Sequence, residues 1–457
     1  MNNRILAIDI GSTKICVAIA EIKNNEPYII GYSKQKSQGI RKGKITNIEL
    51  AAQSIKNALD EIKRITGIEE FPKAIVSISG AYTKSFSSSA IINSVNDEIT
   101  IKEVDRAIKA ASYNSSITRE YSAIHILPYR FKLDDQDDVE DPVGMSGRRL
   151  EIFVHIVAVQ KTSLENFKKT INSAGVEIEN IVLSSYASSI ATLLDDEKDL
   201  GAICIDMGGE TCDMMISLDN SMRHNSHLSV GAENINLDIS LTINTTKLAA
   251  EEIKLHHIDL AQYPKKEEDQ ILEVPCIGKD ETFGVTKEKI YEVVNLRVME
   301  TFSILSNLLH KSELKDQVTT LVLTGGMSKL KNIIMIAKAY FHDKTIRIAR
   351  PIEIKGLSDD AKDETNATII GLLLYGIGKH TNYEKDSKDT IRYKSNKTYS
   401  EIAHNENVNY IHTDLSNLTN NFPKEEKNTK KAVIIAQQDS GDKSLKSSFR
   451  KMMEKLF

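Results

Sequence analysis

Two stretches of this chain, far apart in the sequence, repeat one pattern. The first is RILAIDIGSTKICVAIA at residues 4–20, and the second is AICIDMGGETCDMMIS at residues 202–217. In each, an apolar run that carries one acid ends at a short polar turn, and a second apolar run follows. The two stretches align without gaps, which sets Asp9 opposite Asp206. We therefore expect two similar halves, each beginning with a strand, a turn and a second strand.

The two turns have the composition of a phosphate site. Glycine, serine and threonine leave backbone N–H groups and hydroxyls free to surround phosphate oxygens. A carboxylate just before the turn suits a Mg²⁺ ion that the phosphates carry, bound through water. One such turn is common in strand hairpins, whereas two matching turns could clamp one polyphosphate between them. The residues expected at the phosphates are Gly11, Ser12, Thr13, Lys14, Gly208, Gly209, Glu210 and Thr211, with Asp9 and Asp206 beside the metal.

A third glycine-rich turn follows the strand pattern VTTLVLTGG and leads into the helix pattern MSKLKNIIMIAKAYF. Two glycines between a strand and a helix allow a flat ligand such as adenine to approach the backbone closely. In many α/β folds the same turn serves packing only. Taken alone, Gly325 and Gly326 are open to both interpretations.

The bulk composition limits the classes of protein. A chain of 457 residues is too long for one core, and its 40% hydrophobic content is enough for several packed interiors. The 59 basic and 64 acidic side chains give a net charge of -5, so we expect no nucleic-acid partner. The four cysteines lack metal-binding spacing and fit a reducing cytoplasm. The sequence has no signal-peptide pattern and no apolar run long enough to span a bilayer, so we expect neither secretion nor a membrane span.

Residues 81–160 differ in character from the sequence on either side. They hold a helix pattern at IKEVDRAIKAASYN, strand patterns at AIHILPYRF and RLEIFVHIVAVQ, and an acidic loop at DDQDDVEDPVGMSG. We interpret this segment as a small α+β domain inserted into the first half.

Composition changes again near Lys379. Residues 380–441 are rich in Asn, Lys, Asp, Ser and Thr and poor in large apolar side chains, which predicts a flexible linker. The cluster AVIIA at residues 432–436 is either a partner-binding strand or a chance apolar cluster.

Residues 442–457 are predicted to form an amphipathic helix. Their apolar side chains follow steps of three and four, and the basic side chains lie off that stripe. Such a helix could dock on the protein's own body, but the preceding linker and the basic face favour anionic membrane lipids. The residues expected at the membrane are Leu445, Phe449, Arg450, Met452, Met453, Leu456 and Phe457.

These motifs together resemble the actin/Hsp70/sugar-kinase ATPase superfamily. IDIGSTK is similar to its first phosphate loop, DMGGETCD to its second, and LTGGMSKL to its adenosine motif. SYASSIATLL and NATIIGLLLYGIG resemble its two connecting helices, whose small residues permit close crossing. AAEEIK resembles the helix that reaches the nucleoside, although its Glu and Lys could instead form an exposed helix pair. The resemblance implies ATP and Mg²⁺ as ligands, with the nucleoside at Glu251, Lys254, Gly325, Gly326 and Met327.

Within that superfamily the chain resembles the FtsA family of bacterial cell-division proteins from residue 1 to about residue 380. The responsible stretches are IHILPYRFKLDD and DPVGMSGRRLEIFVHIVAVQ, which are similar to the inserted subdomain of FtsA. The resemblance implies an actin-like protein that polymerises on the cytoplasmic face of the inner membrane at the division site. It also implies that the protein tethers the tubulin-like protein FtsZ and recruits later division proteins.

The same resemblance implies a binding surface for the acidic C-terminal tail of FtsZ. Arg297 is similar to a basic residue that the family uses there, and Lys287 and Lys289 are weaker candidates. Alternatively, Arg297 only pairs with Glu292 or Glu300 on its own helix.

The implied fold is α/β, an actin-like two-lobed ATPase fold with an inserted α+β subdomain in the first lobe, then a disordered linker and a C-terminal amphipathic helix. The expected segments are 1–80, 161–195 and 345–379 for the first lobe, 81–160 for the insertion, 196–230 and 300–344 for the core of the second lobe, 231–299 for its subdomain, 380–441 for the linker and 442–457 for the helix.

One departure bears on catalysis. Many ATPases of the superfamily place an acid or amide before the first connecting helix to orient the attacking water. Here the stretch reads VLSSYASS, with Ser184 and Ser185 and no carboxylate, so we expect slow or negligible hydrolysis. ATP then acts mainly as a conformational ligand. His125 and His155 lie in the insertion and are expected to be structural.

Three other functions are open to a chain of this kind. A sugar or acetate-type kinase would use the same clamp, but it needs a catalytic carboxylate in a second substrate pocket, for which the sequence offers no candidate. A peptide-binding chaperone needs a β-rich domain where this chain has a linker and a helix. A pilus-assembly ATPase shares the inserted domain type, and its partner, a pilus membrane protein in place of FtsZ, would distinguish it.

Overall fold

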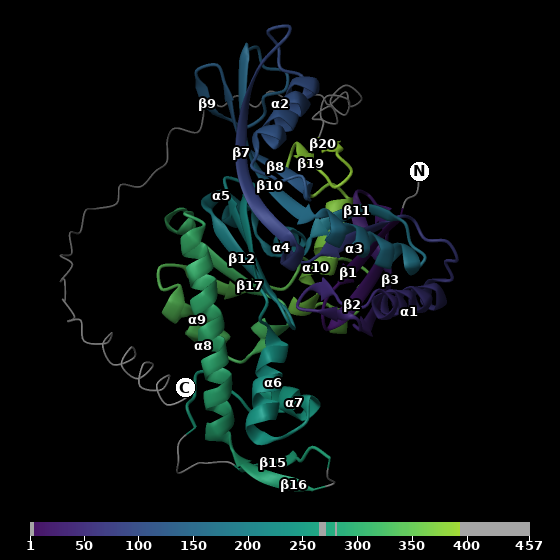
Figure 1. Cartoon of the computed structure of the whole chain (residues 1–457), viewed down its shortest axis with the longest axis vertical. Coiled ribbons are helices and arrows are strands. Elements are labelled where there is room, and N and C mark those ends of the chain that lie inside the picture. Colours follow the sequence, from purple (N-terminus) through teal and green to yellow (C-terminus); the bar gives the residue numbers. More distant parts are fainter. Residues whose placement is uncertain (1–3, 265–270, 279–280, 394–457) are drawn as a thin grey trace, which may run out of the picture. The chain divides into compact units, whose positions relative to one another are not determined.

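Two five-stranded sheets form the centre of the protein, and both have the same topology (Figure 1). The structure is a computed structural model that describes residues 4–264, 271–278 and 281–393, all within one unit of the chain. The strand order is β11-β6-β1-β2-β3 in the first sheet and β14-β13-β12-β17-β18 in the second. In both, three consecutive strands run antiparallel and two later strands continue parallel to the first of them. The predicted duplication is thus confirmed in the topology.

The strands of the first sheet are β1 (Arg4–Ile10), β2 (Lys14–Lys23), β3 (Glu26–Lys36), β6 (Ala74–Ile78) and β11 (Ile178–Leu183). Those of the second sheet are β12 (Ala202–Met207), β13 (Cys212–Leu218), β14 (Ser221–Leu228), β17 (Thr320–Thr324) and β18 (Thr345–Ile348).

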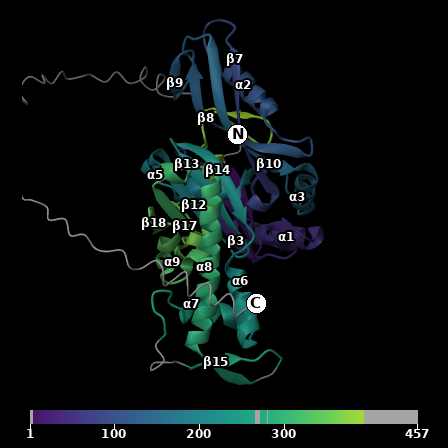
Figure 2. The same ribbon diagram turned by 60° about the vertical axis from the view of Figure 1, so that its left-hand side comes forward.

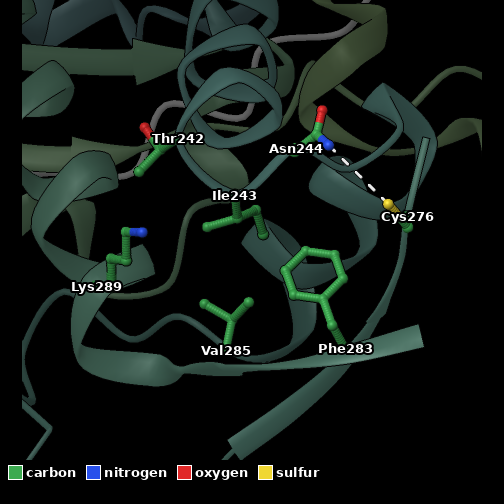
Figure 3. A pocket seen from close by; sticks show the side chains of 7 residues that line it. All are labelled: Thr242, Ile243, Asn244, Cys276, Phe283, Val285 and Lys289. Atoms are coloured by element: carbon green, nitrogen blue, oxygen red, sulfur yellow. Dashed lines mark hydrogen bonds between the residues drawn. The ribbon is translucent and has the colours of Figure 1, made fainter. Parts of the chain in front are cut away.

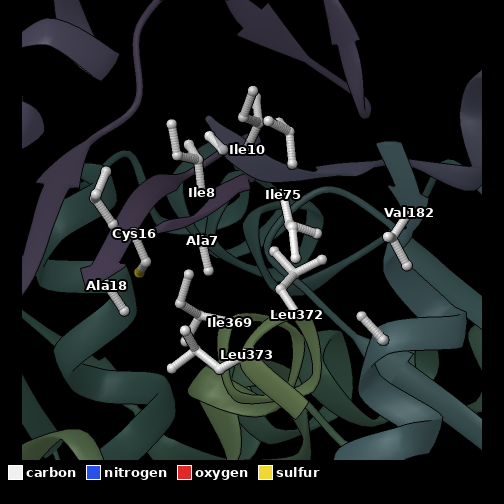
Figure 4. Packing of buried hydrophobic residues seen from close by; sticks show 14 of the residues in the cluster. Ala7, Ile8, Ile10, Cys16, Ala18, Ile75, Val182, Ile369, Leu372 and Leu373 are labelled. Carbon is white, nitrogen blue, oxygen red and sulfur yellow. The ribbon is translucent and has the colours of Figure 1, made fainter. Parts of the chain in front are cut away.

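Two helices lie between the sheets, α4 (Ser184–Thr192) and α10 (Ala367–Gly376), in the stretches predicted as connecting helices. Helix α10 is apolar on every side because it is buried on every side. Figure 4 shows its residues Ile369, Leu372 and Leu373 next to Ala7 of β1 in the core of the first lobe. The predicted close crossing is confirmed at Gly371, where a Cβ would lie only 1.8 Å from the carbonyl oxygen of Ala187.

The remaining helices outside the insertion connect the strands of the two sheets along the chain. They are α1 (Ile48–Thr66), α3 (Lys161–Ser173), α5 (Asp195–Leu200) and α9 (Ile333–Tyr340), with α6 (Ala232–Ile243), α7 (Lys247–His256) and α8 (Lys287–Lys311) in the second half. Beside α6 and α8 lies the hairpin of β15 (Ile271–Pro275) and β16 (Thr282–Thr286). A short hairpin in the first lobe joins β4 (Ile40–Arg41) to β5 (Lys44–Ile45). None of the helices in the described ranges combines the length and apolarity that crossing a bilayer requires.

The insertion is a third sheet with one helix on it. Its long antiparallel strands are β7 (Thr83–Asn93), β8 (Tyr121–Leu133) and β10 (Arg149–Gln160), and α2 (Ile101–Asn114) packs against them. Helix α2 begins with a Thr100–Glu103 capping box, which explains why it starts where the sequence predicts. The acidic loop contains one further short strand, β9 (Gln136–Val139). In Figures 1 and 2 this sheet and the β15–β16 hairpin lie at opposite ends of the described unit.

The structure corrects the predicted start of the linker. Residues 380–393 are not a linker, because β19 (Glu384–Lys385) pairs with β8 and β20 (Ile391–Arg392) pairs with β19. We call residues 380–393 the strap. Its polar composition misled the prediction, since the charged side chains of Glu384, Lys385 and Asp386 are buried and bond to residues from distant parts of the sequence.

Two further predictions are wrong in detail. Residues 345–348 pair with β17 of the second sheet, so they do not open the last segment of the first lobe. The helix predicted over MSKLKNIIMIAKAYF is interrupted, because a short 3₁₀ turn at Gly326–Lys329 precedes α9. The other segment boundaries stay predictions, and the amphipathic helix at 442–457 lies outside the described residues.

Candidate functional site

The first polar turn joins β1 to β2 and is closed by its own backbone. The N–H of Gly11 donates to the carbonyl of Lys14 at 3.0 Å. Asp9, at the end of β1, is buried, and its Oδ1 accepts a hydrogen bond from Ser77 Oγ at 2.8 Å. Burial raises the pKa of Asp9, while Lys14 and the Ser77 bond act in the opposite direction. The turn therefore exposes small groups beside a carboxylate that a cation would stabilise.

The second turn repeats this geometry between β12 and β13. The N–H of Gly208 donates to the carbonyl of Thr211 at 2.7 Å. Asp206 Oδ2 accepts from Ser188 Oγ at 2.6 Å and from Thr368 Oγ1 at 3.0 Å, one from each connecting helix. Burial is the main cause that raises the pKa of Asp206 to about 6. The charges of Asp213 and Asp9 also raise this pKa, whereas the hydrogen bond from Ser188 lowers it.

The two turns face each other at contact distance. A Cβ added at Gly209 would lie 2.2 Å from Thr13 Cγ2, so only glycine allows this approach. The β4–β5 hairpin borders both turns, because the N–H of Gly43 donates to Ser12 Oγ at 2.8 Å and that of Lys42 donates to Glu210 Oε2 at 2.5 Å. The structure thus brings together the two predicted phosphate turns, and it adds a hairpin that the sequence analysis did not single out.

Lys14 reaches from the first turn to the start of α10. Its Nζ donates to Asn366 Oδ1 at 3.0 Å and also to the carbonyl of Thr365, at the start of α10. Its ammonium group therefore links the first turn to a connecting helix.

The third glycine-rich turn, at Gly325 and Gly326, lies against the carboxylate of Asp206. Gly325 has φ +86°, and a Cβ there would lie 2.4 Å from Asp206 Oδ1. Gly326 is open, since a Cβ there would meet only Thr365 Cγ2 at 3.7 Å. The side chain of Met327 is buried in the core of the second lobe, so Met327 can offer a ligand only its backbone.

The two predicted nucleoside residues on α7 differ in exposure. Glu251 is exposed, whereas Lys254 is buried, so the alternative of two exposed side chains fails for Lys254. Burial lowers the pKa of Lys254, and the carboxylates of Glu251 and Glu233 oppose this effect. Because the N–H of Glu233 donates to the carbonyl of Gly209 at 2.6 Å, this cluster is connected to the second turn.

Asp213 and His227 lie directly behind the second turn and were not predicted from the sequence. Thr211 Oγ1 donates to Asp213 Oδ2 at 3.2 Å, and Asp213 Oδ1 lies 2.8 Å from His227 Nδ1. Asp213 could have been noticed in the sequence, because it is an acid in ETCD after the second turn, and the first turn has no matching acid. The histidine could not be found from spacing, since its neighbour is set by the β13–β14 register.

The two histidines of the insertion are buried, as expected for structural residues. His125 bonds to Glu384, and His155 Nε2 lies 3.0 Å from Asn225 Oδ1 of β14. Burial lowers the pKa of His155 to about 3, with His224 adding to the effect. The described residues contain no cluster of three or more histidine, cysteine or acidic side chains arranged to hold a metal ion.

A separate surface carries the basic residues predicted for a partner peptide. Arg297 forms a bidentate pair with Asp238 of α6, at 2.6 and 3.0 Å, and also bonds to Glu300. Its main partner is therefore on another helix, which neither alternative for Arg297 included. Lys287 and Lys289 lie in the first turn of α8. Lys289 borders a cavity of about 320 Å³ between α6, α8 and the β15–β16 hairpin, with Ile243, Phe283 and Val285 on its walls (Figure 3).

The membrane-binding prediction concerns Leu445, Phe449, Arg450, Met452, Met453, Leu456 and Phe457, and all of them lie outside the described residues.

Family models match two parts of this chain. Residues 80–158 match the SHS2 domain inserted in FtsA, and residues 203–371 match the cell division protein FtsA. Among solved structures, the chain resembles the PilM–PilN type IV pilus biogenesis complex with a TM-score of 0.57 and 16% identity, over 82% of this chain and 98% of that one. That likeness concerns the fold alone.

Curated relatives extend the match over most of the sequence. The cell division protein FtsA of Helicobacter pylori is 39% identical over 88% of this chain and 87% of its own length. FtsA of Bacillus subtilis is 31% identical over 82% and 84%, and FtsA of Pseudomonas aeruginosa is 30% identical over 82% and 90%. With the actin-like fold and the inserted domain in place, this chain belongs to the FtsA family of cell division proteins.

Proposed function

We propose that this chain is an ATP-binding, actin-like division protein that polymerises on the cytoplasmic face of the inner membrane. There it holds FtsZ filaments and recruits later division proteins. The observation that carries the nucleotide part is the contact of Gly209 with Thr13, which sets two small-residue turns against each other. A carboxylate lies behind each turn, Asp9 buried and Asp206 partly buried. Backbone N–H groups on both sides of one gap suit a chain of phosphates.

Each part of the site has a role in this proposal. The turns at Gly11–Thr13 and Gly208–Thr211 would bind phosphate oxygens, and Asp9 and Asp206 would hold Mg²⁺ through water. Burial raises the pKa of both carboxyls, and at Asp206 the charges of Asp213 and Asp9 also raise it, so a divalent cation held beside them would favour their ionised forms. The bound metal would neutralise phosphate charge.

Hydrolysis is expected to be slow or negligible. The start of α4 has two serines and no carboxylate that could orient water. Ser184 Oγ donates to the carbonyl of Ile78 at 3.1 Å, and Ser185 is buried. ATP then acts by favouring the polymerising conformation.

The nucleotide proposal is tested by titrating a fluorescent ATP analogue in Mg²⁺ and in EDTA. Saturable binding that weakens at least tenfold in EDTA and in Asp9→Asn supports it. Binding that is absent, or that does not respond to metal or to the variant, overturns it.

The FtsZ part rests on the cavity beside Lys289, where an apolar wall lies next to an ammonium group. A peptide with acidic and apolar side chains fits such a wall. We expect an FtsZ tail peptide to bind several-fold more weakly to Lys289→Ala, with unfolding unchanged. Lys311→Ala removes the same charge from the far end of α8 and is the matched control. Equal affinity for all three proteins would reject this surface.

Arg297 requires a different expectation. Its charge is already balanced by Asp238 and Glu300, so Arg297→Ala should lower stability as well as any peptide affinity. A loss of peptide binding in this variant counts for the surface only if its unfolding midpoint is retained.

The membrane part rests on the sequence pattern of residues 442–457. Co-sedimentation with anionic liposomes, with and without ATP, compares the full chain with a chain ending at Gly441. Pelleting of the full chain alone, enhanced by ATP, supports a tether strengthened by assembly. If both versions pellet or both stay soluble, the helix is not the anchor.

A further inference from the structure

Three polar side chains stand in a row beside the second turn. His227, on β14, has its Nδ1 2.8 Å from Asp213 Oδ1 and its Nε2 2.9 Å from Ser229 Oγ. Asp213 and His227 are largely buried, with side chains 6% and 15% exposed. A hydroxyl, an imidazole and a carboxylate within hydrogen-bond reach have the geometry of an activated nucleophile.

The hydrogen bonds fix the direction of proton transfer. An ionised Asp213 can only accept, so the ring proton of His227 lies on Nδ1. Nε2 then carries a lone pair and must accept, which makes the hydroxyl of Ser229 the donor. His227 is thus placed to take the hydroxyl proton of Ser229, while Asp213 orients the ring and stabilises its charged form.

The row is not needed to hold the strands together. Asp213 and His227 are already opposite each other in the backbone register of β13 and β14. The hydrogen bonds between these side chains are therefore additional to the backbone pairing of the strands. They extend past the end of β14 to Ser229.

Contacts connect all three residues to the proposed phosphate site. Asp213 accepts from Thr211 of the second turn at 3.2 Å. Ser229 is two residues before Gly231, where a Cβ would lie 2.6 Å from the carbonyl oxygen of Gly208. The next N–H, that of Ala232, donates to the same Gly208 carbonyl at 3.1 Å. The nucleophile thus lies on a segment that is bonded directly to the turn.

We propose that Ser229 is a self-phosphorylation site that accepts the γ-phosphoryl group of a nucleoside triphosphate bound between the two turns. The Oγ of Ser229 forms a bond to the γ-phosphorus, and its proton passes to Nε2 of His227. The bond from the γ-phosphorus to the β–γ bridging oxygen breaks with its electron pair, and the nucleoside diphosphate leaves. His227 then releases its proton to water. This inference rests on the proposed nucleotide site.

The proposal also accounts for the absence of a water-orienting carboxylate at the start of α4. In the described site, His227 is a base beside Ser229, and Asp213 orients this base. Ser184 and Ser185, at the start of α4, provide no such pair for a water molecule. Phosphoryl transfer to Ser229 would accordingly occur once per chain, with no continuous turnover.

The test incubates the full chain with γ-labelled ATP and Mg²⁺ and maps the labelled peptide by mass spectrometry. We expect one phosphoryl group per chain, on Ser229, at a rate independent of protein concentration. Ser229→Ala abolishes this label, and Ser229→Thr moves it to the threonine. His227→Asn slows labelling about 100-fold or more, as expected for loss of a general base.

Ser226→Ala is the matched control. Ser226 lies three residues before Ser229, and its buried hydroxyl has no hydrogen-bond partner in the described part of the chain. Its loss should leave labelling unchanged. The same preparations are titrated with a fluorescent, non-hydrolysable ATP analogue.

The two measurements separate the two proposals. If the analogue binds but Ser229 stays unlabelled, or another residue carries the label, the self-phosphorylation is rejected and the nucleotide site stands. If the analogue does not bind, both are rejected. Equal labelling rates in His227→Asn and the wild type would reject the role of the histidine.

Discussion

His125 Nδ1 and Glu384 Oε1 lie 2.7 Å apart, both fully buried, although 259 residues separate them in the sequence. The same carboxylate accepts from Tyr186 at 2.9 Å and from Tyr375 at 2.8 Å. Glu384 therefore joins the strap to the insertion and to both connecting helices. Burial would raise the pKa of Glu384, but these hydrogen bonds, led by that of His125, leave it lowered.

We expect Glu384→Ala to lower the free energy of unfolding by about 3–5 kcal/mol, because it leaves a histidine and two tyrosine hydroxyls buried without their acceptor. Urea unfolding followed by circular dichroism measures the change. Lys388→Ala is the matched control, since it removes an exposed charged side chain of the strap and should cost less than about 0.5 kcal/mol. Equal costs would mean that the strap is not fastened through Glu384.

A second prediction concerns the pH dependence of stability. The pKa of Asp206 is raised from its ordinary value of 3.8 to about 6 in the folded protein. The folded state thus binds this proton more tightly than the unfolded state. The stability that Asp206 contributes is fully present below about pH 4 and is lost as the pH rises through about 6.

Asp206→Asn removes this titration and keeps an acceptor for Ser188 and Thr368. The wild-type free energy of unfolding, minus that of the variant, should therefore fall by about 2 kcal/mol between pH 4 and pH 7. Urea unfolding of both proteins at several pH values, without nucleotide or Mg²⁺, gives this difference. Other acids titrate in both proteins and largely cancel. A difference that stays flat or rises with pH would contradict the shift.

The crossing of α4 and α10 gives a third prediction. A Cβ at Gly371 would meet the backbone of Ala187 at 1.8 Å, and backbone cannot move aside without separating the helices. Gly371→Ala should therefore cost about 3 kcal/mol or more. At Gly376 of the same helix, the atoms nearest to an added Cβ are side-chain methyl carbons of Ile5 and Ile75, at 2.9–3.0 Å. Gly376→Ala should cost clearly less, because side-chain methyl groups shift more easily than backbone. Thermal unfolding of both variants measures the two costs, and similar costs at the two positions would contradict the close crossing.

The sequence predicted the parts of the fold that rest on local patterns. The matching pair Asp9 and Asp206 predicted the duplicated hairpins, and periodicity predicted α2 because its cap and apolar face are contiguous in the sequence. The strap could not be predicted in this way. Its Glu384 and Asp386 look solvated in composition, and they are buried only because His125 and Asn180 meet them in space.

The candidate site divides along the same line. Glycine-rich turns beside carboxylates can be recognised from residue type alone, so the sequence predicted both of the turns that the structure brings together. His227 and Ser229 have ordinary spacing and become notable only through the strand register that sets the imidazole against Asp213. Met327 was predicted by its place in a motif, but burial of its side chain is a property of the whole second lobe.

The last prediction concerns the two adjacent glycines of the third turn. Gly325→Ala would place a Cβ 2.4 Å from Asp206 Oδ1, at a φ of +86° that alanine rarely adopts. It should displace the carboxylate, lower stability by about 1–3 kcal/mol and weaken Mg²⁺-dependent binding of a fluorescent ATP analogue at least tenfold.

Gly326→Ala is its matched partner, because a Cβ there meets only Thr365 Cγ2 at 3.7 Å. It should leave stability unchanged, so any loss of nucleotide affinity in this variant reports a ligand that lies directly on the turn. Unchanged affinity would mean that the nucleoside does not lie on this turn. Wild-type nucleotide binding by Gly325→Ala would contradict the coupling of this turn to Asp206.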